Sequence, residues 1–226
     1  MIKKGKVGRY MAYAVGEILL VVIGILIALQ INEWDVNKSR SALVKQYYQN
    51  MKEQLTVDRH ELTGAIDYSN VYLEQFRQAD RIISNQNRNE TDTLGKISLS
   101  LLKYSDFRRK SSVYQTLVNT GDIKLIANQG ILRNFEELET DYVFIERLED
   151  IHADTALNMV LPNVVLAVQI SPFEVKNPDL LFDYSFHNTF PLFIGLIEEK
   201  NGVYQDAITQ IDALLGAIGL ELDRLN

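Results

Sequence analysis

The chain has 226 residues, a formal net charge of −7 and no cysteine. Without cysteine it has no disulfide, thiol nucleophile or Cys-ligated metal, and it suits an export compartment. Glu33 to Asn226 carries 29 acidic and 19 basic residues, with no basic stripe interleaved with aromatics. A region of that sign repels phosphate backbones, so we expect no nucleic-acid partner.

An apolar stretch near the N-terminus predicts a transmembrane helix over residues 10–34. Ile18 to Leu29 is unbroken apolar. The wider window from Tyr10 to Ile31 reaches about 33 Å as a helix, enough for a hydrocarbon core of ~30 Å. Tyr13 and Trp34 lie where interfacial aromatics are expected. A cleaved signal peptide is the rival interpretation, but no small-x-small cleavage site follows the run.

Charge around the span predicts its orientation. Residues 1–9 contain Lys3, Lys4, Lys6 and Arg9 and no acid, whereas acids and bases are mixed after the span. By the positive-inside rule, residues 1–9 lie in the cytoplasm and residues 35–226 form a periplasmic domain on a bacterial inner membrane. Membrane lipid is then one partner.

Periodicity predicts an all-α fold. Apolar residues recur at alternating spacings of four and three from Val44 to Ile83, a heptad-like seam typical of a coiled coil, with Asp58 and Ser69 as its polar members. The seam predicts one helix from the membrane to about Asn85. A bend is expected at Gly64, and the only β-branched patch is Val164 to Ile170.

The middle of the chain predicts shorter helices. One is capped by Asp92 or Thr93, and the next is capped by Ser105 or Asp106 and ends at Gly121. A longer helix starts at Asn128–Gly130, and Pro162 kinks or ends it. Residues 171–183 read as loop.

The C-terminal part predicts a second long helix. From about Asn188 the apolar spacing runs to the C-terminus without losing phase at Gly202. We expect the helix after the membrane and the C-terminal helix to form the antiparallel spine of an extramembrane helical bundle.

Two stretches resemble a known family. Tyr13 to Trp34, YAVGEILLVVIGILIALQINEW, is similar to the anchor of a single-span membrane-anchored family of Bacteroidota with a domain of unknown function. Ser111 to Asn128, SSVYQTLVNTGDIKLIAN, is similar to that family's second recurrent block. The resemblance implies an inner-membrane address and a helical extramembrane domain, and it implies no catalytic residues.

Glu17 is an ionisable residue inside the predicted span, which makes it a functional hypothesis. On a helical wheel it lies within about 40° of Gly24 and Ala28, with Tyr13 flanking. Small residues allow close helix approach, so this face is predicted to contact a partner helix in a homo-oligomer. The alternatives are a Glu17 side chain that snorkels to the headgroups, and a proton or ion pathway.

Other constellations predict no catalytic, cofactor or metal site. His60, His152 and His187 lie in no motif, and Asp150-x-His152-x-Asp154 has the wrong spacing for metal ligands on one helix face. No P-loop, Gly-x-Ser-x-Gly or His-Glu-x-x-His occurs. Asp92-Thr93-Leu94 and Asp154-Thr155-Ala156 resemble an Asp-Thr-apolar O-glycosylation pattern of Bacteroidota, which makes Thr93 and Thr155 candidate acceptors.

Two functions follow as hypotheses. The first is a non-enzymatic structural or interaction protein that self-associates through its anchor and juxtamembrane helix, with other membrane proteins as further candidate partners. The second is a periplasmic sensing or ligand-binding subunit of a larger membrane complex. Its pocket would be lined by aromatics near loops, namely Tyr104, Phe107, Tyr114, Phe182, Tyr184 and Phe186.

Overall fold

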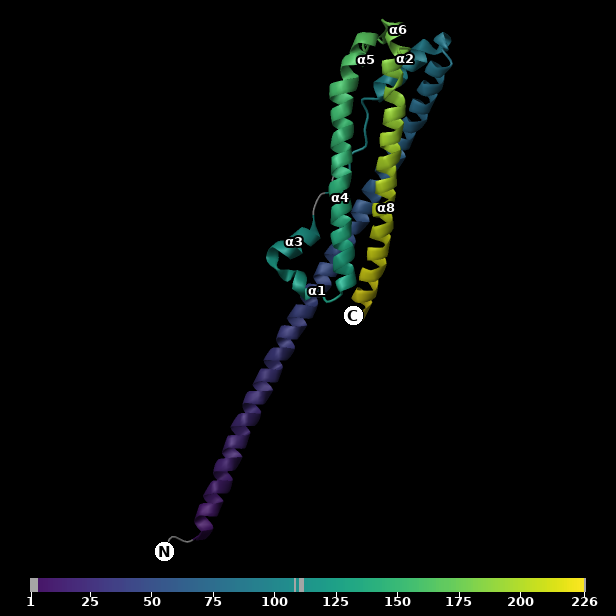
Figure 1. Ribbon diagram of the computed structural model, residues 1–226. Coiled ribbons are helices and arrows are strands. Elements are labelled where there is room, and N and C mark those ends of the chain that lie inside the picture. The colour runs from purple at the N-terminus through teal and green to yellow at the C-terminus, as the bar shows by residue number, and fades with distance from the viewer. Residues whose placement is uncertain (1–3, 108, 110–111, 226) are drawn as a thin grey trace.

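A computed structural model describes residues 4–107, 109 and 112–225, and the side chains of residues 4–10, 12 and 13 are outside that description. Its longest element is α1, Lys4–Ser84, a single helix that projects far beyond the rest of the molecule (Figure 1). The helix is continuous through Gly64. It ends where Gln86 adopts a φ of 49°. The predicted long helix is therefore confirmed.

Two further long helices complete a bundle with the upper half of α1. These are α4, Gln129–Thr155, and α8, Thr189–Arg224, which packs against both α1 and α4. In Figure 1 α8 runs back toward the N-terminal side, antiparallel to the other two helices. The prediction of an all-α fold with an antiparallel spine is confirmed.

Short elements close the end of the bundle farthest from the N-terminus (Figure 1). A 3-10 turn, Arg88–Glu90, leads into α2, Thr91–Ser100. A π-helical turn, Ala156–Val160, links α4 to α5, Leu161–Ala167. A two-residue antiparallel pair follows, in which β1, Val168–Gln169, pairs with β2, Glu174–Val175. The helices α6, Pro178–Leu181, and α7, Tyr184–His187, precede α8.

At the opposite end, α3, Val113–Thr120, and a 3-10 turn, Asp122–Leu125, lie beside the lower part of α4. Gly121 ends α3 with a φ of 74°, the left-handed conformation that glycine adopts without a steric penalty. Asn128 caps α4 by accepting hydrogen bonds from the amides of Gly130 and Ile131. Both features agree with the sequence.

Three boundaries differ from those expected. Glu90, not Asp92 or Thr93, is the residue before α2, and its side chain makes no capping hydrogen bond. Ser112 caps α3, so the expected helix from Ser105 or Asp106 is wrong. Of the two effects expected at Pro162, a kink or an end, the end does not occur, because the helical run continues through the π-helical turn into α5. Pro162 sits in the first turn of α5, directly after that π-helical turn.

The predicted seam of α1 faces the inside of the bundle. Tyr48, Met51, Leu55 and Leu62 belong to a lower hydrophobic cluster with α4 and the C-terminal half of α8. Further along α1 an upper cluster contains Leu73, Phe76, Ala79, Ile82 and Ile83, together with α2, α5 and the N-terminal part of α8. The seam is therefore used within the chain.

Candidate functional site

A layer of buried polar residues separates the two hydrophobic clusters. We call it the polar layer, and it consists of Ser69, Ser105, Glu149, His152 and Lys200, each at most 6% exposed. On α8, Lys200 lies between Ile197 of the upper cluster and Tyr204 of the lower cluster. Buried ionisable groups are rare unless they are paired, so this layer is the first place to look for function.

Lys200 is the centre of the polar layer. Its Nζ donates to the carbonyl oxygen of Ser105 at 3.1 Å and lies 3.3 Å from His152 Nδ1. Burial lowers the pKa of Lys200 to about 8, and the carboxylates of Glu149 and Asp106 oppose that shift. Burial also lowers the pKa of His152 to about 3, and the nearby Lys200 charge adds to it. The imidazole is therefore neutral at ordinary pH.

Glu149 supplies the acidic group of the layer. Its Oε1 accepts the backbone N–H of Phe107 at 2.7 Å and the hydroxyl of Tyr204. Burial raises the pKa of Glu149, while these two hydrogen bonds act in the opposite direction. Burial raises the pKa of Tyr204 as well, so its hydroxyl keeps its proton and acts as a donor.

The polar layer fastens an extended segment, residues 103–107, which we call the strap. Lys200 binds the strap at the carbonyl of Ser105, and Glu149 binds it at the amide of Phe107. These long-range bonds explain why the strap is not helical, because they occupy backbone groups that a helix would use internally. With Lys200 only 1% exposed, its amine is closed to a substrate in this arrangement.

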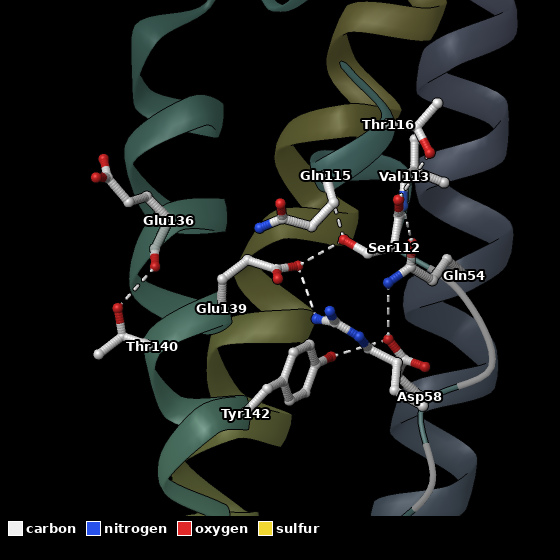
Figure 2. A network of polar contacts seen from close by, with 11 residues as sticks. Gln54, Asp58, Ser112, Val113, Gln115, Thr116, Glu136, Glu139, Thr140 and Tyr142 are labelled. Atoms are coloured by element: carbon white, nitrogen blue, oxygen red, sulfur yellow. Dashed lines mark hydrogen bonds and ion pairs between the residues drawn. The ribbon is translucent and has the colours of Figure 1, made fainter. Parts of the chain in front are cut away.

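A second buried network, drawn in Figure 2, centres on Asp58, which lies nearer the N-terminal end of α1 than Ser69 of the polar layer. Asp58 of α1 accepts from Gln54 Nε2 at 3.1 Å and from the Tyr142 hydroxyl at 3.0 Å. Gln54 Oε1 in turn accepts the amide of Val113 at 2.7 Å. Burial raises the pKa of Asp58, and the two hydrogen bonds oppose that rise. This network joins α1 to α4 and to the start of α3.

Arg109 and Glu139 continue the second network. The Arg109 guanidinium binds Glu139 Oε1 at 2.7 Å and lies 4.8 Å from the centre of the Tyr142 ring. Glu139 also accepts from the Ser112 hydroxyl at 3.1 Å. The side chains of Arg109 and Glu139 are 22% and 13% exposed, so this ion pair is partly shielded from water. It anchors the chain on the far side of the strap.

A cavity of about 620 Å³ lies between the strap and α4. Its walls combine aromatic rings and carboxylates, namely Tyr104, Asp106, Phe107, Arg109, Glu139, Tyr142, Val143, Glu146, Glu149, Asp150 and Ala153. A smaller cavity of about 360 Å³ lies on the other side of the strap, against His60, Gly64 and Tyr68 of α1. Tyr104 and Asp106 line both.

Of the aromatics expected to line a pocket, only Tyr104 and Phe107 line the larger cavity. Tyr114 stacks on Phe135 of the core. Phe186 packs edge-on against Phe190, the ring of Phe182 lies under Arg88, and Tyr184 is 78% exposed. The expected aromatic pocket is therefore divided among several places.

Ser84, His187 and Asp80 lie together near the far end of the bundle. Asp80 Oδ1 lies 2.7 Å from His187 Nε2, and Ser84 Oγ lies 3.5 Å from the same nitrogen. A catalytic triad needs the acid on one ring nitrogen and the nucleophile on the other. This group therefore lacks the geometry of a triad.

The predicted anchor residues lie on the projecting part of α1. Glu17 and Ala28 are exposed, and a Cβ added at Gly24 would meet nothing within 4 Å. The helix includes Tyr13, whose side chain lies outside the described residues. This part of the helix is long and apolar enough to cross a membrane, and none of its most apolar window is buried against the rest of the chain. This agrees with the predicted membrane helix.

The remaining predicted positions are dispersed. Thr93 is half-buried on α2, and Thr155 is the last residue of α4, where its hydroxyl donates to the Ile151 carbonyl at 2.7 Å. His152 is buried while Asp150 and Asp154 are exposed, so these three point to different sides of α4. Among the described residues no cluster of three or more His, Asp or Glu is placed to hold a metal ion.

Sequence reasoning missed Lys200 and Glu149. The signal for Lys200 was its position, three residues after Ile197 and four before Tyr204, which places a lysine in the apolar stripe of α8. The burial of Glu149 was harder to predict from the sequence, because Glu149 directly follows Leu148 of the buried apolar face of α4 and stands among other acidic residues.

Comparison with known proteins adds no identification. Searches against protein-family models, curated proteins and solved structures found no match to this chain.

Proposed function

We propose that this protein is a membrane-anchored, non-enzymatic structural or interaction protein that self-associates through its anchor and the adjoining juxtamembrane helix. The observation that supports it is the isolation of the lower half of α1. Every residue from Glu17 to Leu43 is exposed, and the face that carries Gly24 and Ala28 is open. A span with small residues and an ionisable side chain on one face suits a partner helix better than lipid.

The seam from Val44 to Ile83 does not add to this proposal, because its residues pack inside the chain's own bundle. Association is therefore assigned to the exposed part of α1. In that part the Lys38 ammonium lies 5.1 Å from the Trp34 ring, just beyond the apolar stretch. Such a pair suits the interface between membrane and water.

Cross-linking in native membranes tests the proposal. Gly24→Leu blocks close backbone approach, and Glu17→Ala removes a polar contact worth on the order of 1 kcal/mol in a membrane interior. Val22, about 200° from Gly24 on the helix, supplies the control Val22→Leu. We expect the oligomer to be lost in Gly24→Leu, reduced in Glu17→Ala and kept in Val22→Leu. Equal cross-linking in all three would refute association through this face.

The proposed setting is a bacterial inner membrane, with the N-terminus in the cytoplasm and the bundle in the periplasm. The four bases in residues 1–9 support this orientation. A reporter that is active only in the periplasm, fused after Asn226, should give signal. A silent but stably expressed fusion would reverse the orientation.

A ligand-binding subunit is the second candidate function. The cavity of about 620 Å³ beside the strap supports it, because its size falls in the range of small-molecule sites. Native mass spectrometry of the detergent-purified protein should then show a bound small molecule that is lost in Tyr142→Ala, which removes one wall of the cavity. A mass equal to that of the bare chain would argue against this role.

A further inference from the structure

The strap is held differently from every long element around it. Ser105 and Phe107 are 3% and 8% exposed, so the segment is inserted into the bundle and does not lie on its surface. Yet no backbone–backbone hydrogen bond joins residues 104–107 to another part of the described chain. Its two buried backbone bonds go to side chains, Lys200 of α8 and Glu149 of α4.

The space around the strap is incompletely filled. The larger cavity lies beside it on the side of α4, and the smaller cavity lies beside it on the side of α1. Because Tyr104 and Asp106 line both, the strap forms the wall between the two cavities. Lifting the strap would join them into one groove between α1 and α4. Of residues 104–107, Phe107 is the one that belongs to the lower hydrophobic cluster, so the packing of its ring is the apolar contact that opening breaks.

The side chains that bind the strap, Lys200 and Glu149, are ionisable groups whose burial costs free energy. Removal from water disfavours the charged forms of both Lys200 and Glu149. These two groups satisfy the Ser105 carbonyl and the Phe107 amide of the strap. Glu149 also accepts the Tyr204 hydroxyl, so the polar layer joins α4 to α8 as well as holding the strap.

We propose that the strap is a latch that opens while the helical bundle stays folded, and that Lys200 and Glu149 hold it closed. The structure shows the closed state. In the open state the strap leaves the polar layer, and the two cavities, whose outer walls are already exposed, become one groove. This inference does not depend on self-association through the anchor.

Thiol labelling tests the latch in the full-length protein in detergent. Because the chain has no cysteine, a single Ser105→Cys places the only thiol at a buried position of the strap. Ala207→Cys places the only thiol in the core of α8, where the side chain is fully buried, and reports global unfolding. We expect the thiol at position 105 to react at least about tenfold faster than the thiol at 207, as sub-global opening requires.

Second substitutions identify what closes the latch. Lys200→Met removes the donor to the Ser105 carbonyl, and Glu149→Gln replaces the carboxylate with a neutral amide that accepts more weakly. Each should raise the labelling rate at position 105 about tenfold and raise it more than the rate at 207. Ser69→Ala is the matched control. It lies in the same layer but binds Asn201 at 2.7 Å and not the strap, so neither rate should change.

Two results would overturn the proposal. Equal labelling rates at positions 105 and 207 would mean that the strap opens only when the bundle unfolds. Acceleration of both rates to the same extent by Glu149→Gln would mean that the layer stabilises the whole bundle. If Lys200→Met does not fold, the Glu149→Gln variant and the comparison of the two thiols still decide the question.

Discussion

The two halves of α1 belong to one helix but differ in how their side chains are buried. From Glu17 to Leu43 every residue is exposed, and the apolar part of α1 there is long enough to cross a membrane. Above Val44 one face of the helix is buried and the other is mainly polar. A run that is apolar on nearly all sides has no single face to bury against the rest of the chain. The one-sided run finds its partners in α4 and α8. The upper half is self-contained, and the lower half is not.

The largest expected difference between the halves concerns core packing. Leu62 is fully buried in the upper half, and Leu26 is 57% exposed in the lower half. Leu62→Ala should lower the free energy of unfolding of the bundle by about 2–5 kcal/mol, because it leaves a cavity. Leu26→Ala should leave it unchanged within about 0.5 kcal/mol. Denaturant unfolding in detergent measures both, and a similar loss in the two variants would break the comparison.

Acid should destabilise the upper half through His152. Its pKa is about 3 in the folded protein and 6.5 ordinarily, so between these values the unfolded chain binds more protons. Stability is then lost as the pH falls from 6.5 toward 3, by on the order of 3 kcal/mol at pH 4. His152→Gln should lose less stability between pH 7 and pH 4 than the native chain.

The matched control for that prediction is His60→Gln, because His60 is an exposed histidine of α1. Glu149 and Asp58, whose pKa values burial raises, act in the opposite sense. Both remain in the two variants, so the difference between the variants isolates His152. Parallel stability curves for the two would contradict the assignment.

A smaller loss of stability is expected when the neutral Tyr142 hydroxyl, which joins α4 to α1, is removed. Tyr142→Phe removes the hydroxyl that donates to Asp58 at 3.0 Å and leaves that buried carboxylate with Gln54 as its remaining described donor. We expect a loss of about 1–3 kcal/mol at neutral pH. The loss should shrink at low pH, where Asp58 is protonated. A neutral substitution at pH 7 would show that the Asp58 network is not closed to water.

The smallest effect belongs to the surface. Arg59 and Asp212 form an ion pair at 2.7 Å with side chains 45% and 50% exposed. Water screens such a pair, so Arg59→Met should change the free energy of unfolding by less than about 1 kcal/mol. A larger loss would show that α1 and α8 depend on surface charge as well as on their buried faces.

The sequence was sufficient where local pattern and packing agree. The seam of α1, the cap at Asn128 and the left-handed end at Gly121 were all predictable, because spacing and residue type act within a few positions. It was not sufficient for the strap. Ser105 and Asp106 have the composition of a helix cap, but Lys200, 95 residues away, holds the backbone there in another conformation.

The polar layer could not be predicted either, because its contacts join residues that are far apart in the sequence. Lys200 and Glu149 each lie in an ordinary-looking helix, and only the packing of α4 against α8 brings them to the same strap. Ser69 was visible as a polar member of the seam, but its partner Asn201 lies 132 residues further along the chain. Which polar residues share a layer depends on tertiary register, which a single helical pattern does not contain.

The most direct test of the account is the number of subunits in two variants, one for each half of α1. Native mass spectrometry of the detergent-purified full chain would compare Gly24→Leu with Val71→Asp, which alters an apolar side chain 58% exposed on the bundle. We expect the native chain and Val71→Asp to show the same oligomer and Gly24→Leu to show a single subunit. An oligomer that survives Gly24→Leu but dissociates in Val71→Asp would place association in the bundle and contradict the account.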